Sequence, residues 1–171
     1  IEQLDPSKTY FIKTDIVRWI APDDALVQKN LENYKKGDFS AFEAMNSKLQ
    51  EAVIRRRGLE KSIVDKDLPT KVDPKEFKDL EWAENTDQLT DRLKKLRTLQ
   101  REVVQKLQPD LKEKAFERIA KSQAKQEDRT LDKDPVKMKR TVYSNFLKAF
   151  AASLDAHSVY FTPDEALTFL M

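Results

Sequence analysis

Hydrophobic residues recur at steps of three and four along most of this chain, which places them on one face of an α-helix. The steps are interrupted where proline, glycine or a run of charges falls. The pattern predicts helices over residues 14–20, 22–37, 38–64, 86–109, 111–129, 134–154 and 162–171. The sequence therefore predicts an all-α fold, an irregular bundle of about six or seven helices.

Residues 65–85 break the helical pattern and form the longest irregular connector. Two prolines interrupt them and charged residues dominate. We expect the connector to pack over the helices, because long loops with large apolar side chains usually do so. Its apolar anchors are Val72, Phe77, Leu80 and Trp82.

The segment 134–154 has the widest apolar face in the chain. Asp134 followed by Pro135 is a helix-start signal. We expect this helix to lie at the centre of the core, and either Phe146→Ala or Phe150→Ala to cost about 3–5 kcal/mol. In contrast, we expect the charged end of the segment 111–129 to be an exposed or fraying helix.

Composition narrows the classes of function. The chain has 171 residues, which suit a single domain. Its 32 Lys and Arg nearly balance its 30 Asp and Glu, so no strong field favours nucleic acid as a partner. It has no cysteine, which excludes disulfides, thiol nucleophiles and cysteine-bound zinc. No stretch reaches the roughly 20 apolar residues of a membrane span.

The single histidine, His157, is the first candidate for chemistry, with Asp155 and either Ser158 or Ser153 as triad partners. We disfavour a triad, because catalytic triads are assembled across a fold rather than within one turn. We expect Asp155 to cap the turn instead. One histidine also falls short of the ligands that structural zinc needs, so we expect no metal and no cofactor.

Two further groups of residues have alternative interpretations. The basic run 55–57 suits nucleic acid or pairing within its own helix, and Glu51 and Glu60, each four residues from an arginine, favour pairing. Large amphipathic rings suit either a peptide-binding surface or packing. These rings are Tyr10, Trp19, Trp82 and Tyr160.

Two short elements carry a family resemblance. The pairs at 154–155, 157–158, 160–161 and 162–163 resemble the Leu-Asp-Pro-His-(Ser/Thr)-x-Tyr-(Leu/Phe)-(Ser/Thr)-Pro junction of tail-specific proteases, also called carboxy-terminal processing peptidases. Ala156 departs from the usual proline. Residues 4–11 share the frame Leu-Asp-x-x-x-x-Tyr-Phe with 154–161, hereafter the Leu-Asp frame, and the family has a similar element near its start. We expect Thr14, Thr86 and Thr162 to cap the helices that follow them, with Glu165 completing a capping box at Thr162.

The resemblance implies that residues 1–171 are a single noncatalytic N-terminal helical domain. Residues 155–171 would lead towards a PDZ domain, which takes up the substrate tail, and a protease core with a serine nucleophile and a lysine base. No catalytic residue is then expected in this segment. The expected junction residues are Leu154, Asp155, His157, Ser158, Tyr160 and Pro163.

The resemblance also implies partners and a location. Protein substrates with apolar C-termini are expected, with an adaptor or a second subunit, in the periplasm, either free or associated with the inner membrane. We expect the two-turn helix from Thr162 to pack against a part of the protein beyond Met171, because such short helices are marginal alone. The alternative is a stand-alone helical binding protein or chaperone-like scaffold.

Overall fold

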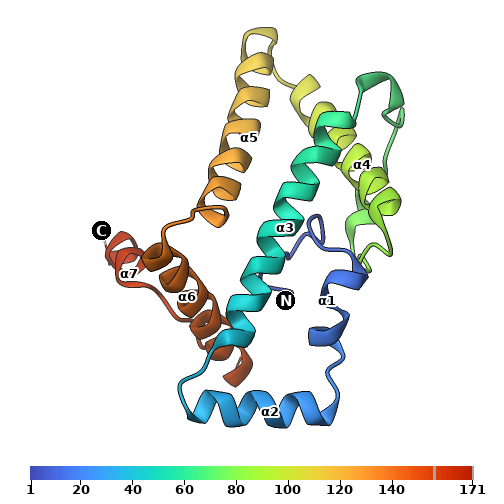
Figure 1. Ribbon diagram of the computed structural model, residues 1–171. Coiled ribbons are helices and arrows are strands. Elements are labelled where there is room, and N and C mark those ends of the chain that lie inside the picture. Colours follow the sequence, from blue (N-terminus) through green and yellow to red (C-terminus); the bar gives the residue numbers. More distant parts are fainter. Residues whose placement is uncertain (156, 171) are drawn as a thin grey trace. The chain divides into compact units, whose positions relative to one another are not determined.

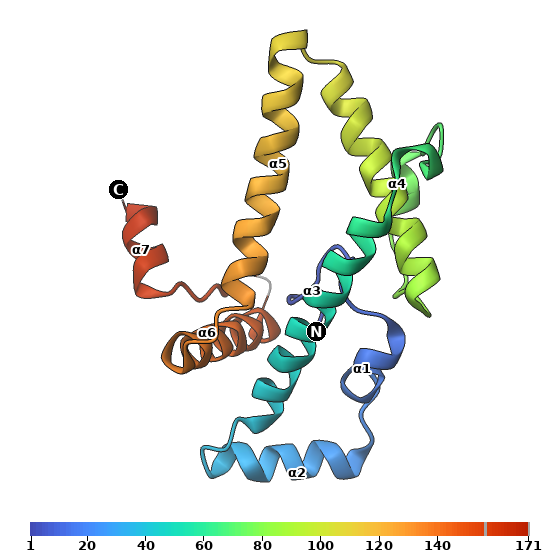
Figure 2. The same cartoon turned by 45° about the horizontal axis from the view of Figure 1, so that its top comes forward.

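The computed structural model describes residues 1–155 and 157–170, and over these residues the fold is all-α, as predicted (Figure 1). Predictions about Ala156 and Met171 lie outside the described residues. No strand forms in the described part, where a parallel bridge joins Ile12 to Ala83. The helices, labelled in two views (Figures 1 and 2), are α1 (Lys13–Ile20), α2 (Asp24–Lys35), α3 (Ser40–Ser62), α4 (Thr86–Gln105), α5 (Pro109–Thr130), α6 (Pro135–Leu154) and α7 (Pro163–Leu170).

The chain divides into two compact units, and α3 contributes residues to both. Unit 1 comprises residues 1–23 and 48–131, and unit 2 comprises residues 24–47 and the chain from Asp132 onward. The expectation of a single domain stays a prediction. Unit 1 holds the two main clusters of buried apolar residues. The first contains Phe11, Ile16, Leu49, Ala52, Val53 and Trp82, and the second contains Ile63, Ala83, Leu89 and Leu93.

The connector from residue 65 to residue 85 packs through its apolar side chains, as expected. Val72 and Trp82 are buried, and Trp82 meets Phe11 edge to face with 6.2 Å between ring centroids. The connector contains short 3-10 helices at Asp65–Asp67 and Pro74–Phe77. The Lys13 amide donates to the Ala83 carbonyl at 2.8 Å, so the connector is also tied to the start of α1.

Unit 2 is built around aromatic side chains, and here the expected central place of α6 is wrong. Val142 is buried, but Phe150 on the same helix is 52% exposed. Phe146 contacts Phe42 at 4.6 Å and Phe39 at 5.4 Å between ring centroids. The apolar face of α6 is wider than the aromatic surface it meets in unit 2, and the main buried clusters are instead in unit 1.

Several helix boundaries follow from local chemistry. Asp134 caps α6 as predicted, and Gly37 follows α2 with a positive φ of 76°. The predicted caps Thr14 and Thr86 are wrong. Ile12 precedes α1, and the Asn85 side chain caps α4 by accepting from two amides at 3.1 and 3.0 Å. A side-chain amide oxygen at Asn85 already satisfies the first donors, so the helix begins one residue earlier than a Thr86 cap requires.

Candidate functional site

The N-terminal turn of unit 1, residues 4–11, is organised by the buried carboxylate of Asp5. This carboxylate is 1% exposed and accepts from the amides of Thr9 at 2.9 Å, Tyr10 at 2.8 Å and Phe11 at 3.0 Å. Amides buried without an acceptor are costly, so the carboxylate allows the turn to be buried. Phe11 is thereby held in the first apolar cluster.

The arginine run of α3 holds this turn and α5 in place. Arg55 pairs with Asp15 at 2.6 Å and donates to the Tyr10 carbonyl at 2.7 Å. Arg57 pairs across unit 1 with Glu127 at 2.6 Å and with Asp128 at 2.8 Å. Charge-assisted bonds of this kind are stronger than neutral ones. These two arginines therefore join elements that are distant in sequence.

Arg56 interrupts the apolar spacing of α3, yet it is only 4% exposed. It donates to the Thr9 hydroxyl at 2.8 Å and pairs with Glu60 at 3.0 Å, which confirms the predicted pairing within the helix. Glu51 instead pairs with Lys48, because Arg55 is taken by Asp15. A buried guanidinium needs such partners.

Tyr10 links the turn to the end of α5. The guanidinium of Arg56 lies over its ring, 4.5 Å from the centroid, and its hydroxyl donates to Glu127 at 3.2 Å. Burial is the main cause that raises the pKa of Tyr10 to about 12. The end of α5, residues 121–129, is mostly exposed, as expected, but Glu127 within it is buried. The helix continues to Thr130.

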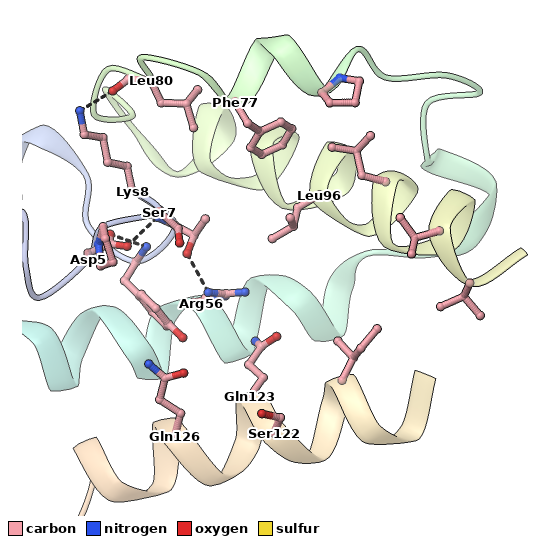
Figure 3. A pocket seen from close by; sticks show the side chains of 18 of the residues that line it. Asp5, Ser7, Lys8, Arg56, Phe77, Leu80, Leu96, Ser122, Gln123 and Gln126 are labelled. Carbon is pink, nitrogen blue, oxygen red and sulfur yellow. Dashed lines mark hydrogen bonds between the residues drawn. The ribbon is translucent and has the colours of Figure 1, made fainter. Parts of the chain in front are cut away.

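A cleft of about 1120 Å³ opens beside this turn, between α4 and α5 and against the connector (Figure 3). A leucine-rich seam, the apolar stripe of α4, explains the cleft. Leu89 and Leu93 at the start of the seam are buried, whereas Val103 near its end is exposed. The distal half of the seam lines the cleft. Its apolar lining includes Leu96, Leu99, Val103, Leu107, Ala115 and Ile119, and Arg56 and Gln123 provide polar groups.

The predicted junction lies in unit 2, between α6 and α7. Leu154 ends α6 and is exposed. The Asp155 carboxylate accepts from the His157 amide at 2.6 Å and from the Ser158 hydroxyl at 2.7 Å, and these bonds, the Ser158 one first, hold the pKa of Asp155 below its usual value. Asp155 thus caps the turn, as expected. The serine hydroxyl is bound directly to the carboxylate, which is not the serine–histidine–aspartate order of a triad.

The start of α7 has the predicted capping box. Thr162 donates its amide to Glu165 at 2.9 Å, the Glu165 amide donates to the Thr162 hydroxyl at 3.3 Å, and Pro163 is the first helical residue. A hydrogen bond from Lys148 at 2.6 Å and those from Thr162 lower the pKa of Glu165 to about 2. Tyr160 is half-buried, and Phe161 stacks on Phe169. The role of these residues as a domain junction stays a prediction.

Sequence reasoning missed two functional partners of the arginine run, Asp15 and Glu127. Asp15 accepts from the Ile12 amide at 2.9 Å while it pairs with Arg55.

In the described residues, no group of three or more histidine, aspartate or glutamate side chains forms a metal site. Over the same part of the chain, no helix is both long and apolar enough to cross a membrane.

The fold and these features define an all-helical module with an apolar cleft in one unit and a turn–helix element in the other. A comparison with protein-family models matches residues 1–164 to the tail specific protease N-terminal domain. The chain therefore belongs to this family and is the N-terminal domain of a tail-specific protease. A comparison with curated proteins found no match.

Proposed function

We propose that this domain is the noncatalytic part of a periplasmic tail-specific serine endopeptidase, and that it frames a PDZ domain and a protease core that follow the junction. The observation that carries the proposal is the family match, which extends through the turn at residues 155–163. In this role the domain controls how a protein substrate with an unstructured, apolar C-terminus reaches the core.

The chemistry of the domain agrees with a role outside the bond-breaking step. A lysine acts as a general base only when its environment lowers its pKa. Two lysines of this domain have pKa values shifted in the opposite direction. A hydrogen bond to Glu84 raises the pKa of Lys13, and one to Asp132 raises that of Lys137. The Ser158 hydroxyl is bound to Asp155 rather than to a base.

The cleft of unit 1 supports a role in binding. Its apolar walls on α4 and α5 suit an apolar peptide segment or a helix, with the polar groups of Arg56 and Gln123 beside them. We propose that this surface receives an adaptor or substrate segment, while the enzyme acts in the periplasm, free or at the inner membrane.

Deleting residues 1–150 from the full protease tests the proposal. Two substrates share the same apolar C-terminal tail, one a short peptide and the other a folded protein. We expect the rate for the peptide to change by less than about threefold and the rate for the folded protein by more than about tenfold, since only the latter needs controlled access. Unaltered substrate choice, assembly and rate for both would refute the framing role.

The isolated chain of 171 residues gives a second test. We expect no hydrolysis of the folded substrate or of the peptide by this chain. The control is Ser158→Ala, which removes the junction hydroxyl without touching a buried cluster. Cleavage by the highly purified chain that disappears in Ser158→Ala would contradict a noncatalytic role.

A further inference from the structure

The turn–helix element at residues 4–20 is repeated 150 residues later, at residues 154–170. Both copies begin with the Leu-Asp frame and continue into an eight-residue helix, α1 or α7, that starts two residues after the phenylalanine. Each copy also has a turn bond between residues three apart, from Lys8 to the Asp5 carbonyl at 3.0 Å and from Ser158 to the Asp155 carbonyl at 3.4 Å.

The repeat extends into the helices. In the first copy Asp15 accepts from the Ile12 amide, and in the second Glu165 accepts from the Thr162 amide, both at 2.9 Å. Each carboxylate is also paired with a cation at 2.6 Å, Arg55 for Asp15 and Lys148 for Glu165. The two elements therefore share the bond at the start of the helix and its ion pair as well as the sequence frame.

The two copies differ in how deeply their aromatic side chains are buried. Phe11 is fully buried, whereas its counterpart Phe161 is 46% exposed. Trp19 packs against the first apolar cluster, whereas Phe169, at the same place in α7, is 76% exposed. The second copy therefore exposes aromatic side chains whose counterparts in the first copy are buried or packed against the core.

A single stripe of α3 covers much of the first copy. Leu49, Ala52 and Val53 pack with Phe11 in one cluster, and Arg56 lies over the Tyr10 ring. These four residues follow the spacing i, i+3, i+4 and i+7, which is one helical face. The small alanine allows close approach, and the guanidinium adds a cation–π contact.

We propose that the exposed rings of Phe161 and Phe169, with the half-buried Tyr160 next to Phe161, form a docking site for an α-helix of this kind, with a small and aliphatic stripe followed by an arginine over the Tyr160 ring. The helix would cover Phe161 as α3 covers Phe11. The residues expected on this partner helix follow from the contacts that α3 makes with the first copy. The surface that it would cover includes the stacked rings of Phe161 and Phe169. The proposal deepens the proposed function by stating what the junction binds, but its test needs only this chain.

The test uses a peptide of residues 46–61 as the probe, with a hydrocarbon staple joining the outward positions of Ser47 and Glu51. The full 171-residue chain is titrated into the labelled peptide, and binding is followed by fluorescence anisotropy. We expect saturable binding that Phe161→Ala or Tyr160→Ala weakens at least about tenfold. The matched control Phe150→Ala removes another exposed phenylalanine of unit 2 and leaves the affinity unchanged.

Changes in the peptide test the predicted stripe. Ala52→Glu in the peptide abolishes binding, because it places a charge against the phenylalanine rings. Arg56→Gln in the peptide weakens binding about three- to tenfold, the loss expected for a cation–π contact. Circular dichroism confirms that each chain variant keeps its helices, which is expected because Phe161 is not part of a buried cluster.

Three results overturn the proposal. One is no binding by the wild-type chain at about 1 mM peptide, the weak limit of specific association. Another is binding that survives both Phe161→Ala and Tyr160→Ala. The third is a dimer of the chain that Phe161→Ala dissociates and the peptide does not, because the occupant is then a second copy. None of these results bears on the deletion test of the protease, so the two proposals fail separately.

Discussion

Replacing Asp5 by alanine removes the acceptor for three amides at once. The amides of Thr9 and Phe11 are buried, whereas that of Tyr10 is partly buried and can reach water. A buried donor left without a partner costs about 1–3 kcal/mol. Two such donors imply a loss of about 2–6 kcal/mol, and we expect about 4 kcal/mol. This is a large part of the about 5–15 kcal/mol that stabilises a typical domain.

Urea unfolding measured by tryptophan fluorescence isolates this effect. Both tryptophans, Trp19 and Trp82, lie in unit 1, so their transition reports the unit that contains Asp5. Asp5→Asn keeps one acceptor oxygen and should lose about half as much free energy.

The matched control is Asp155→Ala, at the same place in the exposed copy of the Leu-Asp frame. The His157 amide and the Ser158 hydroxyl that bind it are exposed and can turn to water, so we expect a change below about 0.5 kcal/mol. Asp155 lies in unit 2, which has no tryptophan, so this control is followed by circular dichroism. A loss below about 1 kcal/mol for Asp5→Ala, or equal losses at the two aspartates, would show that the buried carboxylate does not organise the turn.

Three further predictions concern other parts of the chain. Phe150→Ala should lower the free energy of unfolding by about 1–2 kcal/mol and Phe146→Ala by about 3 kcal/mol, because Phe150 is the more exposed. Unfolding followed by circular dichroism measures both values, and equal losses would contradict the prediction. The folded-state pKa of Tyr10 is above that of the unfolded chain, so unit 1 should keep its stability below pH 10 and lose it towards pH 12, a loss that Tyr10→Phe reduces. The carboxyl of Glu165 should titrate near pH 2 by NMR and higher in Lys148→Ala.

The sequence predicted the helices well because their apolar spacing and end signals are local. Asp134, Gly37 and the Thr162–Glu165 capping box each act within a few residues, and each lies where it was expected. The cap at Asn85 was missed because a neighbouring threonine gives a similar signal. Local chemistry is therefore readable to within a residue or two.

The sequence did not predict which apolar faces are buried, because that depends on the surface each face meets. The face of α6 has the widest apolar stripe, yet Phe150 remains exposed. Arg56 interrupts the apolar spacing of α3, but it is buried because Thr9, Glu60 and the Tyr10 ring surround it. These partners are distant in the sequence or polar, so periodicity does not reveal them.

The two copies of the Leu-Asp frame show how burial decides the hydrogen bonds of a turn. Asp5 accepts from the amides four, five and six residues ahead, whereas the bonds of Asp155 are to the residues two and three ahead. Exposed amides can use water, but buried amides need a protein acceptor. If a helix covers Phe161, the amides of residues 159–161 lose water, and by analogy with Asp5 the carboxylate of Asp155 is the acceptor that replaces it. Docking should then slow hydrogen exchange at these three amides, and Asp155→Ala should remove that protection.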